Sequence, residues 1–227
     1  MPAPFIVIDG TDGSGKGTQT TLLVERLVRE GKHAVRISFP SYGEPSAFFV
    51  ERYLNGTYGK TLNPRAASVL YAVDRFHRAQ EIRALQDAGT IVISDRYVSA
   101  NKGHQAGKIS DPTERRAFIE WLNELEYGIM KIPKPDLTVL LHVPAETASD
   151  LVAQKAERSY IQGGKTRDIH EADLGHLKAA ETAYLELPSV DTAEHWTVLE
   201  CTEGGALLSI DAIHERLWTL LQPHLGA

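Results

Sequence analysis

The chain has 227 residues, of which 42% are hydrophobic, and carries a formal net charge of −6 at pH 7. This length is ordinary for a three-layer α/β fold, so we expect one domain over residues 1–227. The negative charge argues against a nucleic-acid partner, because such proteins usually carry a basic surplus. Asp9 interrupts the first apolar run and no run is long enough to cross a membrane, so we expect neither a secretory signal nor a membrane partner. The single cysteine, Cys201, excludes an intramolecular disulfide and favours a reducing, cytoplasmic location.

An apolar run followed by glycines is the most informative stretch of the sequence. Residues 5–8 predict a strand buried on both faces, and Gly10, Gly15 and Lys16 follow with the spacing of a phosphate-binding loop. The glycines allow backbone N–H groups to converge on one anion, and the helix that follows adds the positive end of its dipole. The alternative is a plain glycine-rich turn, but strand, loop and helix come in the order that the motif requires. The predicted ATP-binding residues are Gly10, Asp12, Gly13, Ser14, Gly15, Lys16, Gly17 and Thr18.

The residue after the lysine departs from the usual motif. A Ser or Thr at that place contributes its hydroxyl to Mg²⁺, whereas this chain has Gly17 and places Thr18 one residue later. Direct ligation of Mg²⁺ by the loop therefore stays open.

Strands and helices alternate along the rest of the chain. Further strands are predicted at residues 35–39, 90–94, 136–143 and 196–200. Helices are predicted up to about Glu30, from Pro45 to Gly56, from Asn63-Pro64 to Gly89, from Asp111-Pro112 onward, after Pro144, and over roughly 172–187 and 210–221. This alternation implies a five-stranded parallel sheet covered on both faces. Ligands of such folds bind beyond the C-terminal ends of the strands.

The long helix after Asn63-Pro64 shows an apolar stripe. Val69, Val73 and Phe76 share one face at helical spacing, and we expect this face to pack on the sheet. Before this helix, residues 39–43 follow the second strand and by themselves indicate no more than a turn.

Polar and aromatic side chains are expected on the other face of the same helix. Tyr71, Arg75 and Arg78 combine an aromatic ring with arginines one and two turns away, which suits stacking on a base and hydrogen bonding to its edge. The alternative is a solvated face with an ion pair such as that of Asp74 with Arg78.

The strand at residues 90–94 leads directly into Asp95 and Arg96. In a parallel sheet these residues lie beside the phosphate-binding loop. Asp95 is then suited to hold Mg²⁺ through water, and Arg96 to bind a second phosphate with two parallel hydrogen bonds. The alternative is a structural ion pair at the end of the strand.

The segment from about 154 to 171 is polar, basic and contains glycines. Phosphoryl transfer has to exclude water, and a mobile basic lid would both exclude it and neutralise charge. Arg158 and Arg167 are the candidate catalytic residues of this lid. The alternative is an ordinary surface loop.

Taken together, these segments resemble the thymidylate kinase family of nucleoside monophosphate kinases. The resembling segments are residues 9–16, 39–43, 70–75, 95–101 and 135–138. They occur in the family's order and cover nearly the whole chain. The resemblance implies a three-layer α/β/α P-loop NTPase fold with a mobile lid. It also implies transfer of a phosphoryl group from ATP to dTMP with Mg²⁺, usually in a homodimer.

The resemblance also implies roles around the acceptor nucleoside. Asp12 would lie near the sugar 3′-hydroxyl, and Tyr71 would stack on the ring. Arg75 would address the thymine edge, helped by Asn101. The guanidinium of Arg75 only donates, so it suits the acceptor oxygen of thymine and not the amino group of cytosine. The predicted substrate-binding residues are Asp12, Phe39, Tyr42, Tyr71, Arg75, Arg96, Asn101 and His104.

The remaining implied roles concern the phosphates. Arg96 and Tyr42 would address the acceptor monophosphate, and Asp95 the metal and phosphate region. The acceptor oxygen is already anionic, so no general base is needed and catalysis rests on positioning and charge neutralisation. The predicted catalytic residues are Lys16, Asp95, Arg96, Arg158 and Arg167.

Three positions depart from the family's pattern. Ser41 stands where an arginine is frequent, and Gly13 stands where some members carry a catalytic arginine, so the lid is expected to supply that charge. His104 stands where a tyrosine credited with disfavouring ribose is common, and the choice of sugar therefore stays open. Two other functions are kept as alternatives: a kinase for another nucleoside monophosphate, and a non-enzymatic nucleotide-binding switch.

Overall fold

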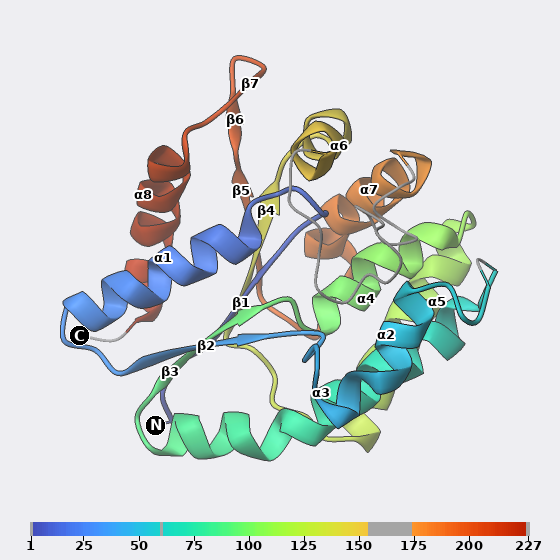
Figure 1. The fold of residues 1–227 in the computed structure, drawn as a ribbon, viewed down its shortest axis with the longest axis horizontal. Coiled ribbons are helices and arrows are strands. Elements are labelled where there is room, and N and C mark those ends of the chain that lie inside the picture. Colours follow the sequence, from blue (N-terminus) through green and yellow to red (C-terminus); the bar gives the residue numbers. More distant parts are fainter. Residues whose placement is uncertain (1, 60, 154–173, 226–227) are drawn as a thin grey trace.

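The computed structural model describes residues 2–59, 61–153 and 174–225. Five parallel strands form a sheet in the order β2-β3-β1-β4-β5, with helices on both faces (Figure 1). The predicted α/β class and five-stranded parallel sheet are thus confirmed. The predicted lid at about 154–171, with Arg158 and Arg167, lies outside the described residues.

The strands lie within one residue of the predicted positions. Their bounds are β1 Phe5–Asp9, β2 Ala34–Ser38, β3 Ile91–Asp95, β4 Leu137–His142 and β5 Trp196–Glu200. β1 pairs with both β3 and β4, which makes it the central strand, and all of its residues are buried. An apolar strand buried on both faces is what residues 5–8 predicted. The sequence did not predict a short hairpin, β6 Thr202–Glu203 with β7 Ala206–Leu207.

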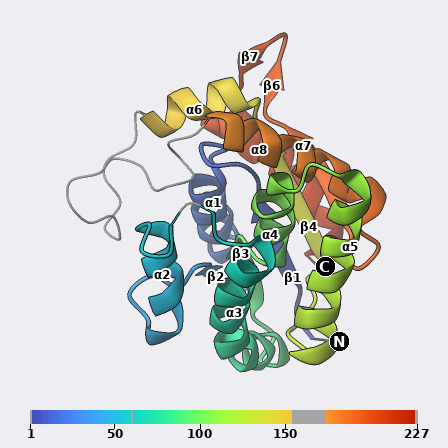
Figure 2. The ribbon, with the colours of Figure 1, turned by 90° about the vertical axis from the view of Figure 1, so that its right-hand side faces the viewer.

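Helices lie between consecutive strands of the sheet, α8 follows the last strand, and together they cover the sheet (Figure 2). Their bounds are α1 Lys16–Arg29, α2 Phe48–Leu54, α3 Pro64–Asp87, α4 Val98–His104, α5 Pro112–Asn123, α6 Ala145–Ala153, α7 Leu174–Val190 and α8 Ile210–Leu221. A π-helical turn, Glu124–Ile129, directly extends α5. Within the described ranges, no helix has both the length and the apolar character needed to cross a membrane.

Alternate residues of the central strand serve different parts of the core. Ile6 and Ile8 belong to the cluster that contains the buried leucines of α1 and α8. Phe5 and Val7 belong to the cluster that contains Ala79 and Ile82 of α3. Successive side chains of a strand point to opposite faces, so a wholly apolar strand can anchor helices on both sides.

Two predicted helix starts are confirmed by side-chain caps. Asn63 Oδ1 accepts a hydrogen bond from the Arg65 N–H at 2.9 Å at the start of α3. At the start of α5, Asp111 Oδ1 accepts from the N–H groups of Thr113 and Glu114 at 2.8 and 2.9 Å. These bonds satisfy N–H groups that have no partner within the helix.

The predicted packing face of α3 is wrong. Val69, Val73 and Phe76 are 38%, 46% and 54% exposed instead of packing on the sheet. The buried side of α3 is mostly small or polar and consists of Ala67, Ser68, Ala72, Asp74, Arg75, Ala79 and Ile82. Polar side chains can be buried there because groups from other segments hydrogen-bond to them. A prediction based on the apolar stripe alone therefore selected the wrong face.

The ion pair suggested for the polar face of α3 does not form either. Arg78 pairs with Glu81 at 2.8 Å on the same helix. Asp74 instead accepts hydrogen bonds from the Ser41 N–H at 2.7 Å and from Ser46 Oγ at 2.6 Å. Asp74 therefore ties α3 to the segment that follows β2.

Candidate active site

The loop between β1 and α1 packs closely against neighbouring backbone at two of its glycines. Gly10 and Gly13 have φ values of 149° and 92°, a region that side chains rarely adopt. A Cβ atom at Gly13 would lie 2.2 Å from the Ala148 carbonyl oxygen of α6, and one at Gly10 would lie 2.5 Å from that of Leu141. The close approach of α6 therefore explains why this chain has no arginine at position 13.

Lys16 begins α1 with its ammonium group turned back over the loop. Its Nζ donates to the Thr11 carbonyl at 2.9 Å and lies 3.4 Å from Asp12 Oδ1. Burial, followed by the nearby charge of Arg96, lowers the pKa of Lys16 to about 8. A buried cation on a loop of converging N–H groups is suited to bind the phosphates of a nucleotide.

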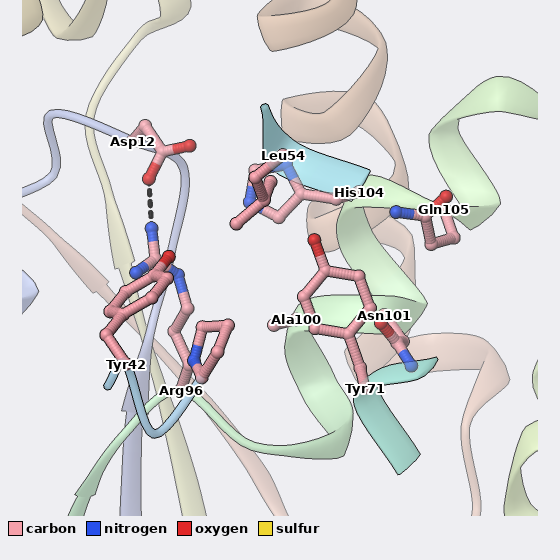
Figure 3. A pocket seen from close by; sticks show the side chains of 10 residues that line it. Asp12, Tyr42, Leu54, Tyr71, Arg96, Ala100, Asn101, His104 and Gln105 are labelled. Carbon is pink, nitrogen blue, oxygen red and sulfur yellow. Dashed lines mark hydrogen bonds and ion pairs between the residues drawn. The ribbon is translucent and has the colours of Figure 1, made fainter. Parts of the chain in front are cut away.

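Arg96 stands at the end of β3 in a left-handed conformation, with φ 68°. This is an uncommon conformation for a residue with a side chain. Its guanidinium pairs with Asp12 (Figure 3). Asp12 also lies 3.4 Å from the ammonium group of Lys16. Asp12 is thus shared between the cation of the phosphate-binding loop and the cation of the neighbouring pocket.

A pocket opens beside Arg96 at the C-terminal ends of the strands. Figure 3 shows Tyr42 and Arg96 on one side of it and Tyr71 and Asn101 on the other, with His104 between them at the back. The lining residues are Asp12, Pro40, Tyr42, Leu54, Tyr71, Arg96, Ala100, Asn101, His104 and Gln105. The structure therefore brings together most of the residues that the sequence predicted for substrate binding.

Tyr71 and Asn101 are held in place on the pocket wall. The Tyr71 ring packs edge-on against Tyr53, with ring centroids 6.2 Å apart and planes at 90°. Asn101 Nδ2 donates to the Ser68 carbonyl of α3 at 3.2 Å. An aromatic face and an amide side by side provide stacking and hydrogen bonding for a planar ring.

Phe39 is not brought to the pocket. Its side chain belongs to the core cluster beneath α3, where its ring centroid lies 5.5 Å from that of Tyr97. Its buried position supports the segment after β2, and the neighbouring Pro40 and Tyr42 line the pocket instead.

Arg75 of α3 is only 1% exposed. Glu126 binds its Nε and Nη2 through both carboxylate oxygens, each at 2.6 Å, and Nη1 donates to the Tyr97 carbonyl at 3.2 Å. Arg75 is not among the lining residues. These bonds use only part of its N–H donors, so its role at the base edge stays a prediction.

Glu126, the partner of Arg75, was not predicted from the sequence. It comes from the π-helical turn after α5 and is fully buried. Its separation of 51 residues from Arg75 leaves no local signal in the sequence. A buried carboxylate in bidentate contact fixes the plane of the arginine fork.

His104 lies at the back of the pocket, between its two sides (Figure 3). Its Nδ1 lies 3.3 Å from Nε2 of His176 in α7, and the two rings stack at 18° with centroids 5.5 Å apart. Burial lowers the pKa of His104 well below its usual value, so the ring is neutral at pH 7. Its buried Nε2 has no hydrogen-bond partner among the described residues.

The two residues before His104 have a structural explanation. A Cβ atom at Gly103 would lie 2.2 Å from the Tyr184 ring, so only glycine fits there. Lys102 is buried between Asp191 and Glu194, at 2.6 and 2.5 Å. The residues at 102 and 103 thus follow from how α4 packs on α7 and the segment before β5.

Asp95 ends β3 beside the phosphate-binding loop, as predicted. Its Oδ2 accepts from Arg36 Nη2 at 2.7 Å, while its buried Oδ1 has no hydrogen-bond partner in the described part of the chain. A carboxylate oxygen left in this state fits a hydrated Mg²⁺, which favours oxygen ligands. Two hydroxyls lie in or next to the phosphate-binding loop. Thr18 is exposed on the first turn of α1, whereas the Ser14 hydroxyl is buried and has no hydrogen-bond partner among the described residues.

The fold and the site define the chain as a P-loop nucleotide kinase. The family model described as thymidylate kinase matches residues 8–203. The thymidylate kinase of Mycobacterium tuberculosis (strain ATCC 25618 / H37Rv) is 30% identical over 197 residues, which cover 86% of this chain and 90% of the relative. That of Leifsonia xyli subsp. xyli is 34% identical over 190 residues, 82% of each chain. The solved thymidylate kinase of Candida albicans has the same fold, with a TM-score of 0.70, 23% identity, and coverage of 98% of this chain and 92% of that one.

The chain belongs to the thymidylate kinase family. It is an ATP-dependent phosphotransferase that converts dTMP to dTDP. The alternative functions, a kinase for another nucleoside monophosphate and a nucleotide-binding switch, are not favoured.

Proposed function

We propose that the γ-phosphoryl group of ATP is transferred in line to an acceptor monophosphate. The ATP phosphates bind the phosphate-binding loop at Lys16, and the acceptor monophosphate is held by Arg96 on the other side of Asp12. The observation that carries this proposal is the sharing of Asp12 by Lys16 and Arg96. Lys16 binds a phosphate of ATP and Arg96 binds the acceptor monophosphate. Because both cations contact Asp12, the two phosphate groups lie close to each other. Charge neutralisation and positioning are the main contributions in this kind of reaction.

The acceptor nucleoside occupies the pocket beside Arg96. Tyr71 stacks on the base, Tyr42 joins Arg96 at the monophosphate, and Asn101 lies at the base edge with Arg75 beneath it. Glu126 keeps the Arg75 fork in one plane, which makes the hydrogen bond to a thymine oxygen directional.

Mg²⁺ is the proposed metal, with Asp95 holding it through water. When bound, it supplies positive charge at the donor phosphates. Arg158 and Arg167 of the segment 154–171, outside the described residues, supply the further charge that Gly13 cannot, and this segment excludes water.

We also propose that the protein acts as a cytoplasmic homodimer. The exposed apolar residues Val69, Val73 and Phe76 lie at helical spacing along α3, and such a face is suited to pairing with a second copy. Phe76→Glu should then give a monomer by sedimentation velocity. The control Ile210→Glu replaces an apolar residue that is 56% exposed in α8, which packs against the other face of the sheet. This variant should remain dimeric, and a dimeric Phe76→Glu protein would contradict the proposal.

A coupled assay of ADP release tests the proposed transfer. ADP should form rapidly only when dTMP accompanies ATP and Mg²⁺, because the acceptor site is built around a monophosphate. ADP formation at the same rate without dTMP would show that water is the acceptor and would contradict the proposed site.

A further inference from the structure

Arg36 joins three elements next to the phosphate-binding loop. It projects from the edge strand β2, and its Nη2 donates to Asp95 Oδ2 at 2.7 Å. Its Nε donates to Thr20 Oγ1 of α1 at 3.0 Å. Because Nε binds α1 and Nη2 binds Asp95, the guanidinium fixes the Asp95 carboxylate relative to both β2 and α1.

Gly17 makes room for this ion pair. A Cβ atom at Gly17 would lie 3.1 Å from Asp95 Oδ2 and 3.6 Å from Arg36 Nη2. The pair therefore borders the space that a Ser or Thr side chain fills in the common form of the loop, where the hydroxyl serves Mg²⁺. A side chain at position 17 would therefore crowd the ion pair of Arg36 with Asp95, and glycine leaves room for it.

We propose that Arg36 is a positioning residue for the ATP half of the reaction. It holds Asp95 against Gly17. The Asp95 carboxylate then serves Mg²⁺ in place of the Ser or Thr hydroxyl that follows the lysine in the common form of the loop. One oxygen of Asp95 is fixed by Arg36, and the other, Oδ1, is buried without a hydrogen-bond partner among the described residues. The inference rests on the proposed role of Asp95.

A purely structural role would affect stability and little else. The side chain of Arg36 is 38% exposed, and ion pairs of this kind contribute little to stability. Arg36 is also absent from the residues that line the acceptor pocket. Its loss should therefore change ATP binding and turnover without changing the apparent affinity for dTMP.

The first test measures binding of Mn²⁺ with a non-hydrolysable ATP analogue by electron paramagnetic resonance. Arg36→Met should weaken this binding about 10–100-fold, the range for residues that orient metal-binding groups. It should lower kcat by a similar factor and leave KM for dTMP within about twofold. Arg36→Lys should recover part of the binding, because an ammonium group can reach Asp95 but not Thr20 at the same time.

Matched variants separate this inference from the proposed function. Arg26→Met removes an arginine that pairs with Glu215 away from the site, and it should bind Mn²⁺ and the analogue normally. Asp95→Asn tests the role of Asp95 itself, and normal binding by it would overturn both claims. If Asp95→Asn is impaired while Arg36→Met binds normally and keeps its kcat, only the inference about Arg36 fails.

A double-mutant cycle tests the link to position 17. Gly17→Ser alone should weaken binding of the analogue about tenfold or more, because its Cβ crowds the fixed oxygen of Asp95. In the Arg36→Met background, Asp95 can move away, and the same substitution should cost less than about threefold. Strictly additive losses would overturn the inference.

Discussion

The buried pair of Arg75 and Glu126 allows a quantitative prediction. The two side chains are 1% and 0% exposed and share two hydrogen bonds of 2.6 Å. Glu126→Gln keeps the shape but leaves the Arg75 cation without a counter-charge. Removing one partner of a buried pair costs about 3–5 kcal/mol. In a chain of this size, that should lower the midpoint of thermal unfolding by roughly 6–20 °C.

The assay compares Glu126→Gln with Glu81→Gln by differential scanning calorimetry. Glu81 pairs with Arg78 of the same helix, but these side chains are 50% and 24% exposed. Loss of such a pair should cost no more than about 1 kcal/mol. Equal unfolding midpoints for the two variants would refute the reasoning that burial makes the Arg75 pair costly to break.

The same variant should alter base selectivity. Without Glu126, the Arg75 fork is no longer held in one plane, so the ratio of kcat/KM for dTMP to that for dCMP should fall in the folded variant. An unchanged ratio would show that Glu126 supports the fold and not the reading of the base.

Further predictions concern the cations of the site. Lys16→Ala and Arg96→Ala should each lower kcat/KM at least about tenfold to a hundredfold in a folded protein, and near-normal turnover would contradict their assignment. Because the pKa of Lys16 is lowered to about 8, the free enzyme loses this proton as the pH rises through that value, and kcat/KM for ATP should fall there. The unfolded chain still binds that proton at such pH values, so this group should make urea-measured stability of the free protein rise with pH from about 8 to about 10. The double variant Arg158→Ala/Arg167→Ala should reduce kcat more than it changes KM, by up to about 10³–10⁵-fold, and an unchanged kcat would mean that the charge comes from elsewhere.

The sequence predicted those parts of the site that depend on local spacing. The turn at Gly10 and Gly13 follows from residue types alone, as do the strand that precedes it and the position of Asp95 at the end of a parallel strand. Helix starts were equally local, because Asn63 and Asp111 cap their own first turns.

The features that sequence analysis missed depend on distant partners. The packing face of α3 carries Arg75 because Glu126, far along the chain, neutralises it. The contact of Arg36 with Asp95 joins residues on neighbouring strands, and the need for glycine at position 103 comes from the ring of Tyr184 in α7. No periodicity in a single segment reports contacts of this kind.

The most direct test of the account is a coupled ADP-release assay of the unmodified protein with dTMP, dUMP and dCMP. A donor-only group at the base edge should reject cytosine by about 10⁴–10⁵-fold, whereas loss of the thymine methyl should cost only about 10–200-fold. We therefore predict that kcat/KM is highest for dTMP, lower for dUMP and far lower for dCMP. Phosphorylation of dCMP as efficient as that of dUMP would contradict it.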